Sequence, residues 1–297
     1  MIDALLLLLT FALGAALSRV SLCAVAGMEQ VVTARNFSGL ERLLLAASGA
    51  GVILLLSAGL VSGAVLLPGA APFHAGIIAG GLLLGLGALL NGGCYLGSVL
   101  YLGSGNLNFL FTLAGIGCGA RAAESLALLP AAAASAPRAA MGPIWIAGVI
   151  FFALIIVVLT RRDGQKGRWL ALLAGALAGL VYARHPGWSY GSVLESLAHG
   201  RLDLMNWSAN LSALLLFAGA IAGARLGGRF KLQWPTLQRA LRCAAGGLVM
   251  GCGAALVPGG NDALLLWAIP GLTVYGVLAY TVMLATVGLG FLAAAAL

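Results

Sequence analysis

The feature that most constrains this chain is a long segment, residues 43–120, that contains no Asp, Glu, Lys or Arg. A second segment, from Cys243 to the C-terminus, contains one charged residue, Asp262. Only 8% of the 297 residues are charged and 62% are hydrophobic, whereas a soluble domain carries about 25% charged residues. The sequence therefore predicts an all-α integral membrane protein.

Apolar runs that approach the roughly 20 residues of a membrane-spanning helix recur along the chain. We expect about nine spans or half-spans, of which the first is a true span, because no basic residue precedes it as in a signal peptide. The runs lie near residues 3–17, 43–67, 76–90, 107–120, 143–160, 168–182, 208–224, 243–257 and 264–297.

The net charge of +8 is concentrated in two short segments, since residues 161–168 contribute +3 and residues 225–242 contribute +5. Basic short loops mark the cytoplasmic side of a membrane. We therefore expect both loops in the cytoplasm, the N-terminus outside, and a lipid bilayer around the chain. No nucleic-acid partner is expected from this charge.

Two apolar segments are broken by similar glycine-rich sequences, Asn-Gly-Gly-Cys at 91–94 and Pro-Gly-Gly-Asn-Asp at 258–262. Aligning the two Gly-Gly pairs places Cys94 opposite Asn261. Helices broken once in each half are typical of transporters built from inverted repeats. We predict one membrane domain, residues 1–297, with pseudo-symmetric inverted halves at about 1–142 and 165–297, linked by the span at 143–160.

Four interruptions, at residues 19–27, 91–106, 184–192 and 257–262, are polar or rich in glycine. Short broken or re-entrant helices that start there would direct their unpaired N–H groups, which favour anions, toward one another. The pattern predicts an hourglass shape with a narrow, uncharged constriction for a small anion.

We predict that the residues around these breaks contact the anion. Neutral thiols, amides and N–H groups are weak enough to release what they bind, as transport requires. The candidates are Cys23, Asn91, Gly92, Gly93, Cys94, Asn106, Trp188, Tyr190, Cys252, Gly259, Gly260 and Asn261. No cofactor, metal ligand or catalytic residue is predicted, because the cysteines lack metal-binding spacing.

Three other residues have simpler interpretations. Cys118 and Cys243 are expected to be small buried packing residues. Asp262 is expected to cap the short helix that follows it.

The chain resembles the YeeE/YedE family of membrane proteins, which take up thiosulfate and related sulfur compounds. The motifs that carry the resemblance cover most of the chain, namely Cys23, residues 91–94, 103–106, 188–190, 246–251 and 258–262. The resemblance implies that thiosulfate meets cysteines in a central constriction, with Cys23 and Cys94 as pathway cysteines. The family usually has a third pathway cysteine. At the corresponding break this chain has Asn261, and its nearest cysteine is Cys252, further upstream. It also implies a cytoplasmic TusA-like sulfurtransferase as a partner.

The leading hypothesis is thiosulfate uptake across a bacterial inner membrane by a protein that is not an enzyme. One alternative is transport of another sulfur or selenium anion, such as sulfite. Another is a membrane-embedded sulfurtransferase with a Cys94 persulfide, which would need an activated thiolate. A purely structural membrane subunit is the remaining alternative.

Overall fold

The computed structural model describes residues 3–60, 65–69, 74–126, 138–139, 144–160, 166–186, 188–200, 207–257 and 259–295. Residues 161–165 of the first predicted basic loop, and Pro258 of the second glycine-rich break, lie outside them. The helices are α1 (Ala4–Val20), α2 (Ala24–Ala34), α3 (Ser38–Leu60), α4 (Ala75–Asn91), α5 (Tyr95–Gly103), α6 (Phe109–Ser125), α7 (Ile144–Thr160), α8 (Lys166–Arg184), α9 (Tyr190–Ala198), α10 (Trp207–Leu226), α11 (Leu237–Leu256), α12 (Asn261–Ala263), the π-helix η1 (Leu264–Ala268) and α13 (Val274–Ala295). Strands β1 (Leu66–Leu67) and β2 (Arg138–Ala139) form a short antiparallel pair.

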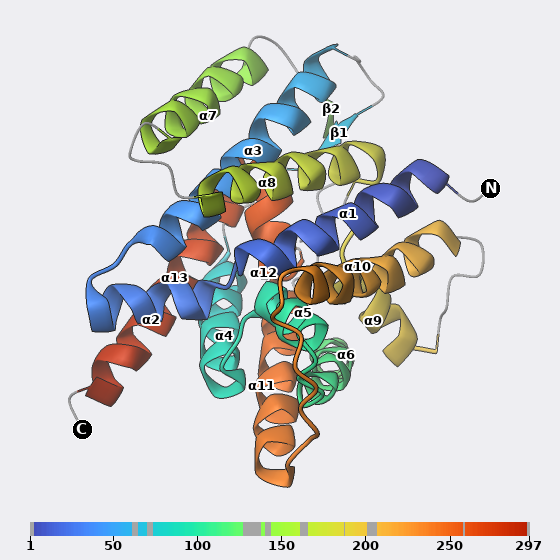
Figure 1. The fold of residues 1–297 in the computed structure, drawn as a ribbon, viewed down its shortest axis with the longest axis vertical. Helices are drawn as coiled ribbons and strands as arrows, with labels where there is room; N and C mark the ends of the chain where they lie inside the picture. Colours follow the sequence, from blue (N-terminus) through green and yellow to red (C-terminus); the bar gives the residue numbers. More distant parts are fainter. Residues whose placement is uncertain are drawn as a thin grey trace.

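An internal repeat organises these helices. The order long, short, long, long, short, long occurs in α1–α6 and again in α8–α13, where α12 and η1 together form the second short element. The packing repeats as well: α1 packs on α10 as α8 packs on α3, and α6 packs on α11 as α13 packs on α4. α4 also meets α11, and α1 meets α8, so each of these contacts joins equivalent helices of the two repeats. α7 has no counterpart and lies at the edge of the molecule beside α3 (Figure 1).

Five helical segments of the described chain are long and apolar enough to cross a membrane. They are Ala4–Ala34, Ser38–Leu60, Ala75–Gly103, Trp207–Leu226 and Val274–Ala295. A sixth arises if Leu237–Leu256 and Asn261–Ala268, which are bent by 54° at the second break, form one span. The predicted number of about nine spans and the hourglass shape therefore stay predictions.

The helix breaks follow from local backbone chemistry. α4 ends at Gly92, whose φ of 68° lies in the left-handed region, and the N–H of Gly93 donates to the carbonyl of Ala88 at 3.1 Å. Glycine is favoured at such a helix end because it has no Cβ to clash. α11 ends differently, since Val257 is extended (φ −117°, ψ 137°). The two breaks thus use different backbone conformations.

Close helix packing depends on glycine at the contact between α6 and α11. A Cβ at Gly119 would lie 2.1 Å from the carbonyl oxygen of Leu248, and a Cβ at Gly251 would lie 2.2 Å from that of Ile116. Small residues that let two backbones approach are typical of membrane helix interfaces.

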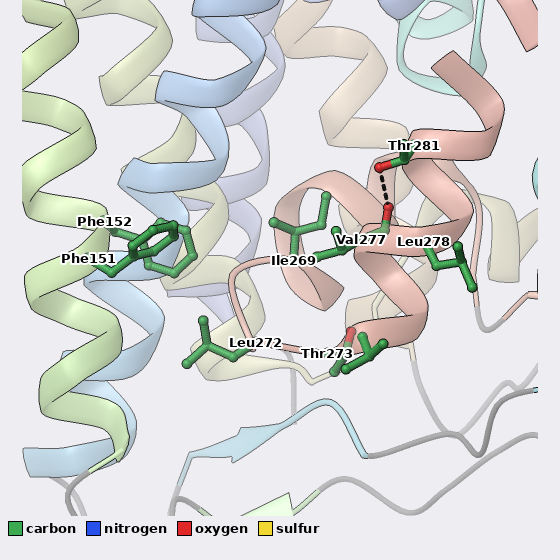
Figure 2. Close-up of a pocket in the computed structure, with 9 residues that line it drawn as sticks. Phe151, Phe152, Ile269, Leu272, Thr273, Val277, Leu278 and Thr281 are labelled. Carbon is green, nitrogen blue, oxygen red and sulfur yellow. Dashed lines mark hydrogen bonds between the residues drawn. The ribbon is translucent and has the colours of Figure 1, made fainter. Parts of the chain in front are cut away.

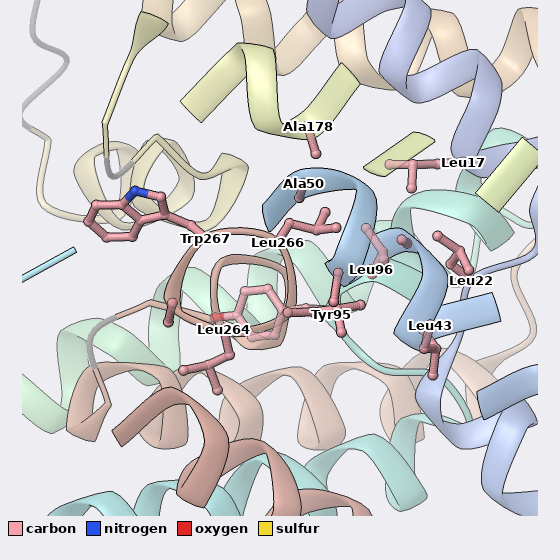
Figure 3. Packing of buried hydrophobic residues seen from close by; sticks show 14 of the residues in the cluster. Leu17, Leu22, Leu43, Ala50, Tyr95, Leu96, Ala178, Leu264, Leu266 and Trp267 are labelled. Atoms are coloured by element: carbon pink, nitrogen blue, oxygen red, sulfur yellow. The ribbon is translucent and has the colours of Figure 1, made fainter. Parts of the chain in front are cut away.

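The core lies where the short helices meet the long ones. Tyr95, Leu96, Leu264 and Leu266 are each 3% exposed or less, and Figure 3 draws them among the buried residues of this core. An apolar groove of about 550 Å³ lies farther out, between Phe151 and Phe152 of α7 and the start of α13 (Figure 2). None of the predicted site residues lines this groove.

Candidate functional site

The structure brings two predicted pathway cysteines together. Cys23 precedes α2 and Cys94 precedes α5, and their Sγ atoms lie 3.8 Å apart. Both are buried, with exposed fractions of 5% and 1%. Two segments about seventy residues apart in the sequence therefore present adjacent thiols at the starts of two short helices.

Backbone N–H groups point at this thiol pair. The N–H of Ala24 at the start of α2 and that of Gly97 in the first turn of α5 each donate to Cys94 Sγ at 3.4 Å. A helix start carries a partial positive charge. The surroundings of Cys94 thus favour an electron-rich atom, either its own sulfur or an anion in contact with it.

Gly97 also provides the space for both sulfur atoms. A Cβ at this position would lie 2.6 Å from Cys23 Sγ and 3.5 Å from Cys94 Sγ. The first of these distances is far below van der Waals contact, so only glycine fits here without displacing Cys23.

The second half of the chain meets the same short helix. Asn261 Oδ1 accepts a hydrogen bond from the N–H of Leu96 at 3.4 Å, and Tyr190 Oη donates to the carbonyl of Tyr95 at 2.7 Å. The starts of α5, α9 and α12 therefore form one connected group. The predicted candidates Asn261 and Tyr190 lie within it.

Asn91 supports the α4–α5 break from inside. Its Nδ2 donates to the carbonyl of Gly93 at 2.6 Å and to Ser98 Oγ at 3.1 Å, while its Oδ1 accepts from Thr112 Oγ1 at 2.7 Å. Since Asn91 is fully buried and its amide is used by these bonds, it positions the turn that carries Cys94.

A cavity of about 280 Å³ reaches Cys23. Its polar lining consists of Ser18, Ser21, Tyr101, Ser104 and Arg229. Nη1 of Arg229 donates to Ser21 Oγ at 2.8 Å and Nη2 donates to the carbonyl of Ser18 at 2.5 Å. Among the described residues no carboxylate pairs with Arg229, so its positive charge is available beside the cavity. We call this cavity the Arg229 vestibule.

Other predicted residues lie outside the thiol pair's immediate contacts. Asn106 bridges to Gln233 of the basic loop, beyond the end of α5. Trp188 is buried, and its Nε1 donates to the carbonyl of Ala209 at 3.3 Å. The Cys252 thiol donates to the carbonyl of Gly119 at 3.2 Å, which places it in the α6–α11 contact.

The candidate glycines shape the breaks. Gly92 and Gly259 have positive φ values of 68° and 95°. A Cβ at Gly93 would lie 3.0 Å from the Tyr101 ring, and one at Gly260 would lie 2.8 Å from the Tyr95 ring. Gly260, rather than Asn261, precedes the first residue of α12, so by helix starts Cys94 corresponds to Gly260.

Two simpler expectations are wrong. Cys118 is exposed on the outer face of α6 instead of buried, whereas Cys243 is buried as expected. Asp262 does not cap α12, because Gly260 occupies the cap position; its Oδ2 instead accepts from Ser189 Oγ at 3.0 Å.

The candidate site residues predicted from the sequence did not include Gly97, Ser189 or Arg229, although Gly97 and Ser189 lie within the interruptions at 91–106 and 184–192. Ser189 could have been found, because an isolated serine just before a helical run is a helix-cap signal, and it occupies the cap of α9. Gly97 and Arg229 gave no local signal, since their roles depend on contacts with distant segments. No group of three or more potential metal ligands occurs in the part of the chain that the structure describes.

Comparison with known proteins identifies the family. A family model described as sulphur transport matches the chain twice, over residues 19–168 and 134–289. A search of curated proteins finds no significant match. The two matches together span most of the chain and agree with the internal repeat. The chain therefore belongs to the sulphur transport (YeeE/YedE) family, as a multi-pass membrane protein that transports a sulfur compound.

Proposed function

We propose that the protein takes up thiosulfate across the bacterial inner membrane, and that the anion passes the Cys23–Cys94 thiol pair. The observation that supports this most is the 3.8 Å separation of the two sulfur atoms, at a point where the N–H groups of Ala24 and Gly97 converge on Cys94. Thiosulfate has charged oxygen atoms for the N–H groups and a polarizable terminal sulfur for the thiols.

Neutral thiols suit transport better than a fixed cation would. Their S–H groups are weak donors, so they contact the anion without trapping it, and conduction needs sites that are left as readily as they are entered. A thiolate would repel the dianion. The pathway cysteines are therefore expected to stay reduced and protonated during transport.

The Arg229 vestibule supplies the first or last electrostatic attraction on one side of the pair. Arg229 lies in the basic segment 225–242, which we assign to the cytoplasm with the first basic loop, residues 161–168. The N-terminus would then lie outside, and the halves at about 1–142 and 165–297 would be inverted around the link at 143–160. An attractive cytoplasmic mouth beside uncharged thiols draws the anion from the narrowest point toward the cell interior.

The test is uptake of radiolabelled thiosulfate by a host that lacks its own importers, with Cys23→Ala, Cys94→Ala and the exposed control Cys118→Ala. Loss of one contact worth about 1.4 kcal/mol in the rate-limiting state lowers the rate about tenfold. We expect reductions of at least that size for the first two variants and normal uptake for Cys118→Ala. Equal uptake by all three would exclude the thiol pathway but leave the transport function standing.

Three further measurements separate the alternative functions. A well-expressed wild type that takes up sulfite or selenite but not thiosulfate would assign another anion. A persulfide on Cys94, detected by mass spectrometry after incubation with thiosulfate and absent from Cys94→Ala, would indicate a sulfurtransferase. A cytoplasmic TusA-like acceptor is a further proposed partner, to be tested by whether its addition increases net uptake.

A further inference from the structure

The second half of the chain contains a carboxyl group where the first half contains thiols. Cys23 and Cys94 precede α2 and α5, whose repeat counterparts are α9 and α12. Ser189 precedes α9, and Gly260 precedes α12 with Asp262 two residues later. Ser189 Oγ donates to Asp262 Oδ2 at 3.0 Å. The equivalent meeting point of two short helices therefore pairs a hydroxyl with a carboxyl.

The carboxyl of Asp262 is buried and only half satisfied. The residue is 5% exposed, and Oδ1 has no hydrogen-bond partner among the described residues. Isolated ionised carboxylates are far more costly to bury than neutral acids, and ionisable groups inside a membrane are usually functional. The neutral acid is therefore the resting form, and Oδ1 is the atom free to carry the proton.

No cation lies on the helices near this carboxyl except at their ends. α12 and η1 pack against α3, α5, α8 and α13, and through Ser189 against the start of α9. The charged residues of these helices are Glu41, Arg42, Lys166, Arg168, Arg184 and Glu195, and each lies within five residues of a helix end. Three buried tyrosines, Tyr95, Tyr182 and Tyr190, lie within electrostatic reach of Asp262.

Hydrogen bonds made by the neighbours of Asp262 and Ser189 connect the Asp262 region to the helix that carries Cys94. Its neighbour Asn261 accepts from the N–H of Leu96, and the Tyr190 hydroxyl, next to Ser189, donates to the carbonyl of Tyr95. Both bonds end on the first two residues of α5, directly after Cys94. A change in the charge of Asp262 therefore acts on the short helix that holds Cys94.

We propose that Asp262 is a proton-binding site that couples uptake of the anion to inward movement of a proton. The inference rests on the proposed function. The membrane potential, negative inside the cell, opposes entry of a dianion. Each proton that enters with the anion reduces the net negative charge moved by one. The Asp262 O–H bond forms with a proton from the outer side and breaks with release to the inner side, and no other bond changes.

The test uses the purified full-length chain in liposomes that contain a pH-sensitive dye, with the membrane potential clamped. Two quantities are measured: exchange of radiolabelled thiosulfate against internal unlabelled thiosulfate, and acidification of the lumen during net uptake. The wild type is expected to show both. Asp262→Asn is expected to keep exchange, because the amide imitates the neutral acid, and to lose acidification down to the level of protein-free liposomes.

Two further variants keep the result interpretable. Asp262→Glu retains a titratable group and is expected to keep acidification. Asp3→Asn is the matched control: the same chemical change at a residue that caps α1 on the surface, where asparagine caps equally well. It is expected to behave as wild type.

Each other outcome has a distinct meaning. Wild-type uptake without acidification, acidification by Asp262→Asn, or loss of exchange by a correctly folded Asp262→Asn would each overturn the proton site and leave transport intact. Absence of thiosulfate exchange by the wild type would overturn the proposed function, and this inference with it.

Discussion

Arg239 donates a hydrogen bond from Nη2 to the carbonyl oxygen of Asn91, the last residue of α4, at 3.0 Å. The last four carbonyls of a helix have no partner within it, and a cation near this end also interacts favourably with the helix dipole. Arg239 itself lies in the first turn of α11, where a positive charge is unfavourable for its own helix. Its contact with α4 compensates for that position.

We expect Arg239→Ala to lower the thermal stability of the detergent-solubilised protein. The lost bond to a charged group is worth about 1.5–3 kcal/mol, which exceeds the roughly 0.3–1 kcal/mol gained by relieving the dipole of α11. The midpoint of thermal unfolding measures the difference. Arg242→Ala is the control, since it removes an exposed charge from the same helix. Equal midpoints for the two variants would contradict the role assigned to Arg239.

The breaks, and the position of Cys23 and Cys94 beside them, could be anticipated because glycine and polar residues interrupt apolar runs in a way that is visible locally. The register between the halves could not. Aligning the Gly-Gly pairs placed Cys94 opposite Asn261, but the helix starts place it opposite Gly260. The reason is that α4 ends with a left-handed glycine whereas α11 ends with an extended valine.

The directions in which the Cys252 and Arg229 side chains point could not be predicted from the sequence either. Cys252 lies in a regular helix, so its surroundings depend on which helix packs against that side. In the structure its thiol meets Gly119 of α6. The sequence indicated only that Arg229 belongs to a basic loop. Its contacts with Ser18 and Ser21 join two segments more than 200 residues apart, and no local pattern predicts them.

Gly97→Ala should block the thiol site with little change in the fold. The added methyl would lie 2.6 Å from Cys23 Sγ, so Cys23 must move from its position beside Cys94. We expect uptake to fall at least about tenfold, the consequence of roughly 1.4 kcal/mol in the transport barrier, while the elution profile in detergent stays that of the wild type.

Gly167→Ala is the matched control, because its Cβ would meet no atom closer than 3.7 Å. This variant is expected to transport normally. Normal uptake by Gly97→Ala as well would mean that the space between the two sulfur atoms is not on the pathway.

A membrane-permeable thiol oxidant should inhibit the wild type reversibly. The Sγ atoms of Cys23 and Cys94 are 3.8 Å apart and need to approach to about 2.05 Å to form a disulfide. Non-reducing peptide mapping is expected to find these two cysteines joined and Cys243, which is buried in a regular helix, still free. Reductant should restore uptake. Free thiols at positions 23 and 94 after complete oxidation of the exposed Cys118 would contradict the observed proximity.

Arg229→Gln should weaken the apparent affinity for thiosulfate on the cytoplasmic side, measured as efflux from cells preloaded with the anion, more than the maximal efflux rate. The guanidinium lies at the vestibule and not at the thiol pair, so it acts on the concentration of anion near Cys23. A unit charge near a protein surface changes the interaction with a nearby anion by about 1–4 kcal/mol, depending on the local dielectric. We therefore expect the apparent KM to rise about fivefold or more, with the smaller effect at high ionic strength that screening predicts. Arg229→Lys should restore most of the affinity because lysine keeps the positive charge.

Lys231→Gln is the control, because it neutralises an exposed residue of the same loop. It should leave the KM near wild type. If Lys231→Gln raises the KM as much as Arg229→Gln, the attraction belongs to the loop's overall charge and the vestibule has no special role.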